Sequence, residues 1–499
     1  MIRTTSESVP HALDPPRNCH LKKGCAPAGR DLLVQGALVG IITYWVIWMI
    51  YTQTFHPLAK FLGSFWASVT RFWTVLHVLP GDAEKRQRKP HAEYGPVVRI
   101  APNELITSDP EAINTLYGVK SSTTKTDFYL AFRPPWARFP DHFSSQRGKQ
   151  HGDRRRIVSN VYTMTSLGEI SDRKESFDLW IWTRMYAYDV IGELYFSKMF
   201  GFLQAGGDQL GYTDATDDLI SVQFLAGNMP TYVRSLFMLT GIVFPKVRRA
   251  LKALDILTNA TNEMLKGRVA ALDSNDATSK PQRADILGKL LDIMHKRGKE
   301  VDFEIRDVKM ECFGGFFAGS ETTALTLSGI FYHILHTPRI YTKLQAEIDA
   351  AASSGQLSTP HIAYTEAVKL PYLVACIEEG MCMHPITGVS FPRHAPAQGC
   401  SLGGYYIPGN ARIGVNPAVI HFDKSVYGDD ADVFSPERWI EASADKERAM
   451  DGCISMCEIY KAIPQLMKEF TFELATKKMQ TTSYWPYKPV SIEVNVRRR

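Results

Sequence analysis

Cysteine is scarce in this chain, and its cysteines follow no pattern typical of a metal site or a disulfide framework. The 499 residues contain eight, at Cys19, Cys25, Cys312, Cys376, Cys382, Cys400, Cys453 and Cys457. Zinc sites use short, paired Cys or His spacings, and small secreted domains use closely spaced disulfides. Histidine forms no His-x-x-x-His or Glu-x-x-His cluster either. We therefore expect free thiols in a reducing compartment and no zinc site.

Long linkers, internal repeats and a strong charge of one sign are absent as well. No Pro/Gly/Ser-rich stretch divides the chain, and the net charge is only +5. No basic stripe interleaved with aromatic residues is present, which argues against nucleic-acid binding. Hydrophobic residues make up 45% and aromatic residues 11% of the chain, enough for a sizeable core. One large folded body is the simplest interpretation.

One long run without charged residues lies near the N-terminus. Leu32 to Tyr51 contains 20 uncharged residues, and about 20 apolar residues cross the hydrocarbon core of a bilayer. We expect an N-terminal tail over 1–31, a single-pass membrane anchor over 32–51 and one domain over 52–499. A signal peptide is disfavoured because about 30 residues precede the run. Basic residues flank it on both sides, so charge does not set its orientation.

Hydrophobic periodicity predicts a mostly helical body with a minor β part. Helices are expected over 154–164, 185–195, 248–272, 285–296, 303–335 and 454–470, the last of them kinked at Pro464. Short strands are expected over 97–100, 104–107 and 411–415. The polar segment 273–283 is expected to be an exposed loop, and the charged run 84–89 a solvated turn.

The most informative segment is Glu311–Thr323, which reads Glu-Cys-Phe-Gly-Gly-Phe-Phe-Ala-Gly-Ser-Glu-Thr-Thr. It places Glu321 and two hydroxyls inside an otherwise apolar helical run that should cross the interior of the domain. Threonine hydroxyls can bond to the carbonyl four residues back and bend the helix. This predicts room for a small molecule or water beside Glu321. A core helix with a capped polar defect is the alternative.

Three further motifs, in this order along the chain, carry a family resemblance. His151–Arg156 comes first, Cys376–Pro385 follows with Glu379 inside it, and Phe434–Trp439 comes last. Together with Ala318–Thr323 they resemble the cytochrome P-450 family of haem-thiolate monooxygenases, in its filamentous-fungal, pisatin demethylase-like branch. The resemblance implies a mainly α fold with small β sheets, arranged as a helical triangular prism.

The resemblance also implies roles for individual residues. It makes Glu321 and Thr322 catalytic, in proton delivery. It makes Arg155, Arg393, Ala318 and Gly319 haem-binding, and Glu379, Glu437 and Arg438 a structural set. It implies haem iron as cofactor and oxidation of an apolar small molecule, in fungal secondary metabolism. Electrons would come from an NADPH-dependent flavoprotein reductase, since this chain has no nucleotide-binding glycine fingerprint. It implies an endoplasmic-reticulum anchor with the catalytic body in the cytosol.

Two departures from the family pattern leave alternatives open. The Phe-x-x-Gly-x-x-x-Cys loop that holds the iron thiolate is missing after Arg438, and Cys453 is the nearest thiol, about four positions late. Cys382 stands where the family's Glu-x-x-Arg motif has arginine, so Arg438 is the remaining guanidinium for Glu379. The chain is a monooxygenase whose gene model lost the loop, a catalytically defective or non-enzymatic remnant, or a protein that binds haem through Cys453 with altered activity.

Overall fold

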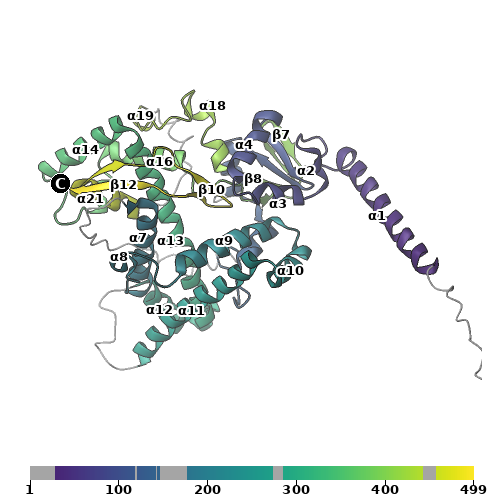
Figure 1. Cartoon of the computed structure of the whole chain (residues 1–499), viewed down its shortest axis with the longest axis horizontal. Coiled ribbons are helices and arrows are strands. Elements are labelled where there is room, and N and C mark those ends of the chain that lie inside the picture. Colours follow the sequence, from purple (N-terminus) through teal and green to yellow (C-terminus); the bar gives the residue numbers. More distant parts are fainter. Residues whose placement is uncertain (1–27, 119–120, 142, 147–176, 274–284, 442–456) are drawn as a thin grey trace, which may run out of the picture. The chain divides into compact units, whose positions relative to one another are not determined.

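The computed structural model describes residues 28–118, 121–141, 143–146, 177–273, 285–441 and 457–499 (Figure 1). The chain divides into two units, residues 1–56 and 57–499. The first contains α1 (Ala28–Thr54). Within α1, Leu33–Thr54 has a mean hydropathy of 1.9 and no residue buried in its most apolar window. By length and composition this helix can cross a membrane, as the sequence predicted.

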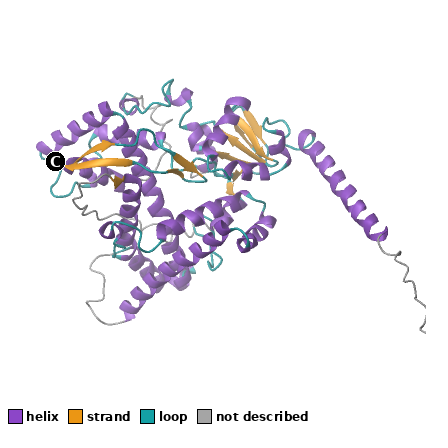
Figure 2. Ribbon diagram, in the orientation of Figure 1, coloured by secondary structure: helices purple, strands orange, loops and turns teal. Residues whose placement is uncertain are grey.

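The second unit is mostly helical (Figure 2). Its longer helices are α4 (Ala83–Tyr94), α7 (Leu179–Phe196), α9 (Tyr212–Asn228), α10 (Thr231–Leu239), α11 (Pro245–Asp273), α12 (Ile286–Val301), α13 (Ile305–His336), α14 (Pro338–Ser353), α16 (Pro371–Met383) and α21 (Cys457–Glu469). Short helical segments are α2 (Phe65–Val69), α3 (Phe72–Val78), α5 (Glu111–Tyr117), η1 (Asp127–Phe132), α8 (Phe202–Ala205), η2 (Thr240–Ile242), α15 (Tyr364–Ala367), α17 (Pro417–Ile420), α18 (Lys424–Tyr427) and α19 (Glu437–Ile440). The predicted helices at 185–195, 248–272, 285–296 and 303–335 are confirmed.

The strands form one larger sheet and three small ones. The five-stranded sheet has the order β1 (Val97–Ala101), β2 (Glu104–Thr107), β8 (Arg412–Val415), β5 (Arg393–His394) and β3 (Thr124–Lys125). The others are β4 (Phe177–Asp178), β12 (Glu493–Arg498) and β9 (Phe470–Leu474); β10 (Thr481–Ser483) and β11 (Tyr487–Pro489); and β6 (Cys400–Leu402) and β7 (Tyr405–Ile407). All three predicted strands are present. The predicted helix 154–164 lies outside the described residues, as does almost all of the loop 273–283.

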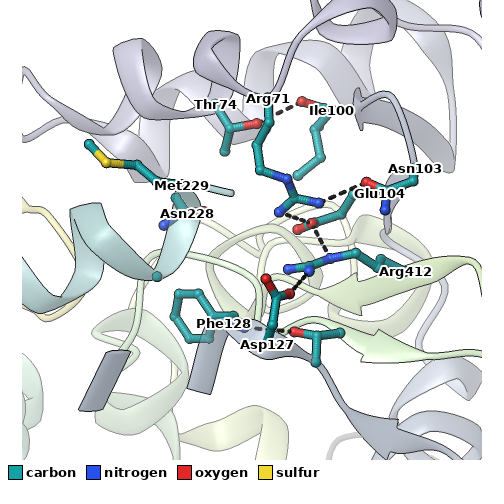
Figure 3. Close-up of polar contacts among 12 residues, drawn as sticks. Arg71, Thr74, Ile100, Asn103, Glu104, Asp127, Phe128, Asn228, Met229 and Arg412 are labelled. Atoms are coloured by element: carbon teal, nitrogen blue, oxygen red, sulfur yellow. Dashed lines mark hydrogen bonds and ion pairs between the residues drawn. The ribbon is translucent and has the colours of Figure 1, made fainter. Parts of the chain in front are cut away.

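A buried ion cluster holds the larger sheet to the elements around it (Figure 3). Glu104 of β2 pairs with Arg71 and with Arg412 of β8, each at 2.8 Å. Arg412 also pairs with Asp127 of η1, and Asp127 pairs with Arg234 of α10 at 3.2 Å. Burial opposes ionisation of Glu104, but the two guanidinium groups outweigh it and lower its pKa. The cluster joins five segments that are distant in sequence.

The prediction of a solvated turn at 84–89 was wrong. It lies inside α4, not in a turn, and Glu84 is buried. Glu84 pairs with Arg88 one helical turn later at 2.7 Å, and the Arg88 guanidinium lies 3.7 Å from the centroid of the Phe422 ring. These contacts bury one side of the helix despite its charges. Pattern alone missed this because the partner ring lies more than 300 residues away.

The core lies on both sides of the middle of α13. Toward its N-terminus, Val308, Phe313 and Phe316 pack in one cluster with side chains of α7, α11 and α12. Toward its C-terminus, residues from Leu327 to Leu335 pack in a second cluster with α14, α16 and α21. The segment between the two clusters is the predicted polar notch.

Candidate active site

The notch in α13 is accessible on one side. Ala318 is exposed, and Thr322, one helical turn later, is half-buried. The Thr322 hydroxyl donates to the Ala318 carbonyl at 3.0 Å, and the Thr326 hydroxyl donates to the Thr322 carbonyl at 2.9 Å. This confirms the expectation that hydroxyls here bond to carbonyls four residues back. Such bonding loosens the helix where a ligand can approach it.

Glu321 lies next to Thr322 but is buried, with 2% of its surface exposed. Its Oε2 accepts a hydrogen bond from Arg184 Nε of α7 at 3.1 Å, while its Oε1 has no hydrogen-bond partner among the residues that the structure describes. Lys488 Nζ of β11 lies 3.5 Å from that open oxygen. Arg184 and Lys488 both pair with Asp217 of α9 as well. Two cations and two carboxylates therefore form one network around Glu321.

The charges of this network reinforce one another. Burial disfavours the charged form of Arg184, yet the carboxylates of Glu321 and Asp217 outweigh burial and raise its pKa. Arg184 therefore stays cationic. Asp217 and Lys488 are the more exposed members, with 35% and 18% of their side chains accessible. The network thus leads from a partly solvated ion pair to a buried carboxylate beside Thr322.

Glycine in the notch lets α7 approach α13 closely. A Cβ at Gly319 would lie 2.8 Å from Ile191 Cδ1 of α7. The structure therefore gives Gly319 a packing role, while Ala318 is the residue exposed on the accessible side. The family resemblance implies haem binding for both residues, and that role stays a prediction.

Arg393 of β5 is the described candidate for binding the haem carboxylates. Its guanidinium lies 5.2 Å from the ring centroid of Tyr117 and 5.7 Å from that of Tyr129. Its Nε is buried and has no hydrogen-bond partner in the described part of the chain. A buried, unpartnered guanidinium nitrogen normally indicates a missing acceptor. Arg155 and His151 lie outside the described residues.

Glu379 of α16 is fully bonded by its neighbours. Its Oε1 accepts from Ser435 N at 2.9 Å and from Arg438 Nε at 3.1 Å, and its Oε2 accepts from Trp439 Nε1 at 2.8 Å. Arg438 thus supplies the guanidinium that Cys382 cannot. Glu437 does not join this set: it pairs with Arg339 at 2.7 Å and Lys343 at 3.1 Å, both on α14.

The described cysteines are poor candidates for an iron ligand. Burial raises the pKa of Cys312, Cys376 and Cys400, which disfavours the thiolate that binds iron. Cys382 is buried against Tyr427 and Ala431. Cys453 lies outside the described residues, and nothing is described of the side chain of Cys457.

The residues present fit haem at the two places that the structure describes. Arg393 offers a guanidinium whose buried Nε has no hydrogen-bond partner among the described residues, and α13 presents Ala318 and Thr322 along an accessible stretch. Sequence reasoning missed Arg184, Asp217 and Lys488. Arg184 could have been recognised, because a charged residue in the mostly apolar segment Leu179–Phe196 needs a buried partner. No local pattern marks Asp217 or Lys488.

The sequence model of the cytochrome P-450 family matches residues 141–452, more than half of the chain. The chain belongs to the cytochrome P-450 family. The family brings a haem-thiolate iron centre and, typically, NADPH-derived electrons from a reductase. The match ends directly before Cys453, where the sequence departs from the family loop.

Several fungal P-450 enzymes are similar over most of their length. Cytochrome P-450 monooxygenase gsfF of Penicillium aethiopicum is 35% identical over 93% of this chain and 98% of its own. Cytochrome P-450 monooxygenase ACRTS1 of Alternaria alternata is 34% identical over 64% of this chain and 92% of its own. Pisatin demethylase of Fusarium vanettenii is 28% identical over 93% of each chain. These relatives confirm the predicted family and branch.

Proposed function

We propose that this chain is a working haem monooxygenase that oxidises an apolar small molecule in fungal secondary metabolism. The observation that carries the proposal is the buried Glu321, directly before Thr322 in α13: among the described residues its Oε1 has no hydrogen-bond partner and only a long ion pair with Lys488 at 3.5 Å. A buried carboxylate oxygen without a donor is costly. Its retention next to an accessible hydroxyl supports a chemical role over a purely structural one.

In the mechanism, the chain's own residues position the cofactor and move protons. Haem, when bound, supplies the iron at which oxygen is activated and a carbon–hydrogen bond oxidised. Arg393 and Arg155 would hold its carboxylates through charge-assisted hydrogen bonds. Thr322 would present its hydroxyl on the accessible side of α13. Glu321 would pass protons to Thr322 Oγ1, and general acid catalysis of this kind contributes about 10²- to 10⁴-fold.

The ligand to iron in this proposal is Cys453. Because the Glu379 set is complete without the family arginine, the loss at Cys382 does not by itself remove the fold that supports a haem site. A reductase would deliver electrons to the cytosolic body. The apolar helix α1 would anchor the chain in the endoplasmic reticulum.

The absorption spectrum of the full chain in membranes, reduced and exposed to carbon monoxide, tests the proposal. We expect a strongly red-shifted Soret band, which reports a thiolate on iron. Cys453→Ala should abolish it, whereas Cys400→Ala, on strand β6, should leave it unchanged. Folded protein without stoichiometric haem would instead favour the catalytically defective alternative. An unshifted band would mean that the thiolate does not reach iron.

A further inference from the structure

Aromatic side chains from five separate segments pack together in one cluster. They are Phe128 and Phe132 of η1, Phe143, Phe224 of α9, Phe391, and Trp485 in the turn between β10 and β11. Trp485 contacts three of the others, with ring centroids 5.3 Å from Phe132, 5.9 Å from Phe143 and 5.8 Å from Phe391. We call these six residues the aromatic cluster.

Two of the segments that supply the aromatic cluster also contact α13. Lys488 follows Trp485 by three residues in the same hairpin and reaches Glu321 at 3.5 Å. On another side, Asp141 precedes Phe143 by two residues, and its Oδ2 would lie 3.4 Å from a Cβ at Gly314 of α13. Gly314 is one helical turn before Ala318. The hairpin of Trp485 and the segment before Phe143 therefore both reach the part of α13 to which the proposed function assigns the chemistry.

The indole of Trp485 brings a polar group into this cluster. Its Nε1 is buried and has no hydrogen-bond partner in the described part of the chain. An unpartnered buried donor costs about 1 to 3 kcal/mol, and buried indole N–H groups normally find an acceptor. The rings that surround Trp485 offer no conventional acceptor. A partner from outside the chain would satisfy this donor.

A second buried polar atom without a partner lies on α9. It is Gln223 Oε1, and no hydrogen bond to it is found among the described residues. Gln223 precedes Gly227 by one helical turn, and a Cβ at Gly227 would lie 2.8 Å from the Phe128 ring. The same region thus offers one free donor and one free acceptor beside aromatic rings.

We infer that the substrate is a flat aromatic molecule with an oxygen acceptor, a carbonyl or an ether, that takes the hydrogen bond of Trp485. The inference rests on the proposed function and narrows its substrate to one chemical class. Aromatic rings pack on one another more favourably than area alone predicts. A buried donor also selects against molecules without an acceptor, because it is then left unpartnered.

Equilibrium binding of two matched probes tests this inference. Fluorenone carries a ring carbonyl, and fluorene has the same flat ring system with a methylene in its place. Titration calorimetry on the detergent-solubilised full chain measures both affinities. Fluorenone should bind about ten times more tightly than fluorene, which is the order of one hydrogen bond. A saturated bicyclic ketone, decalone, should bind more weakly than fluorenone.

Trp485→Phe isolates the hydrogen bond, because it keeps an aromatic ring and removes the N–H. In this variant fluorenone and fluorene should bind equally, and fluorene should keep its wild-type affinity. Trp66→Phe is the matched control, since Trp66 is exposed on α2, and it should keep the preference for fluorenone.

Equal binding of the two probes to the wild type, or a preference that survives Trp485→Phe, would overturn the inference. So would decalone binding as tightly as fluorenone. The carbon monoxide spectrum of the same preparation separates the two claims. A red-shifted band without a preference for fluorenone would refute the substrate class alone. A spectrum without the red-shifted band would refute the proposed function, and the calorimetric preference would then describe a binding site only.

Discussion

Glu321 and Glu379 lie on two helices that pack against each other, α13 and α16. Both are buried, with 2% and 1% of their surfaces exposed. Glu379 has hydrogen-bond donors on both oxygens, one of them from a backbone N–H. Glu321 has one hydrogen-bond donor within the described part of the chain, and its second oxygen has only Lys488 at 3.5 Å. The same residue type at the same depth thus has two environments.

The number of hydrogen-bond donors around each carboxylate suits Glu379 to a structural role and Glu321 to the proposed catalytic role. A carboxylate with donors on both oxygens fixes the positions of its partners. Glu321 has a hydrogen-bond donor on only one of its oxygens among the described residues, and the other oxygen faces a lysine that Asp217 also holds. We therefore expect Glu379 to stabilise the fold, and Glu321 is the glutamate to which the proposed function assigns catalysis.

The largest expected effect comes from removing the partner of Glu379. Arg438→Met would leave a buried carboxylate without its cation, which typically costs about 3 to 5 kcal/mol. Denaturant unfolding measures the loss. Glu379→Leu combined with Arg438→Met should recover most of it, because no charge is then left unpaired. Arg339→Met, at the exposed pair with Glu437, should cost less than about 1 kcal/mol.

Restoring the family arginine should also destabilise the protein. Cys382→Arg would place a second guanidinium near Arg438, in a site packed against Tyr427 and Ala431. Overpacking of this kind costs about 1 to 3 kcal/mol, and Cys382→Ala should cost less. A gain in stability for Cys382→Arg would mean that Arg438 leaves Glu379 incompletely paired.

Acid should destabilise the protein through its buried histidines. Burial lowers the pKa of His421 to about 4, and it has the same effect at His384, also to about 4. The unfolded chain takes up these protons near pH 6.5, so stability is complete above that pH and falls as pH drops toward 4. His421→Gln should reduce the slope by about 1.4 kcal/mol per pH unit. His361→Gln, at an exposed position, should leave the slope unchanged.

The smallest expected effect on stability is at Lys488. Its side chain is partly exposed, and Arg184 still pairs with Glu321 when it is removed. Lys488→Met should therefore cost less than about 1 kcal/mol in denaturant unfolding. Lys246→Met, which removes a lysine held over Tyr484 of the same hairpin, is the control. If Lys488→Met lowered the free energy of unfolding by several kcal/mol and Lys246→Met did not, the Glu321 network would be mainly structural, like that of Glu379.

Local patterns predicted the elements well, because periodicity and turn residues act within a few positions. The strand at Glu104–Thr107 is found with the predicted bounds. The hydroxyl bonds of the notch followed from the residue types, since they join positions four apart. The run at 84–89 failed because its burial depends on Phe422, which no local pattern contains.

The partners of the two glutamates show where sequence reasoning ends. Arg438 was proposed for Glu379 because the family motif already names that segment. The network of Glu321 joins α7, α9 and β11, and nothing near Glu321 in the sequence points to Arg184 or Lys488. Long-range pairing is a property of the fold. Arg155 and Cys453 lie outside the described residues and remain predictions.

The most direct test of the contrast between Glu321 and Glu379 compares Gln variants of the two residues. The measured quantity is the hydrogen peroxide released per NADPH consumed, with reductase and an aromatic ketone that the wild type oxidises. Glu321→Gln should keep its haem content, lose product by about 100-fold, and release peroxide instead. Glu379→Gln should lose stability but make wild-type product per haem. Wild-type product from Glu321→Gln would contradict the account.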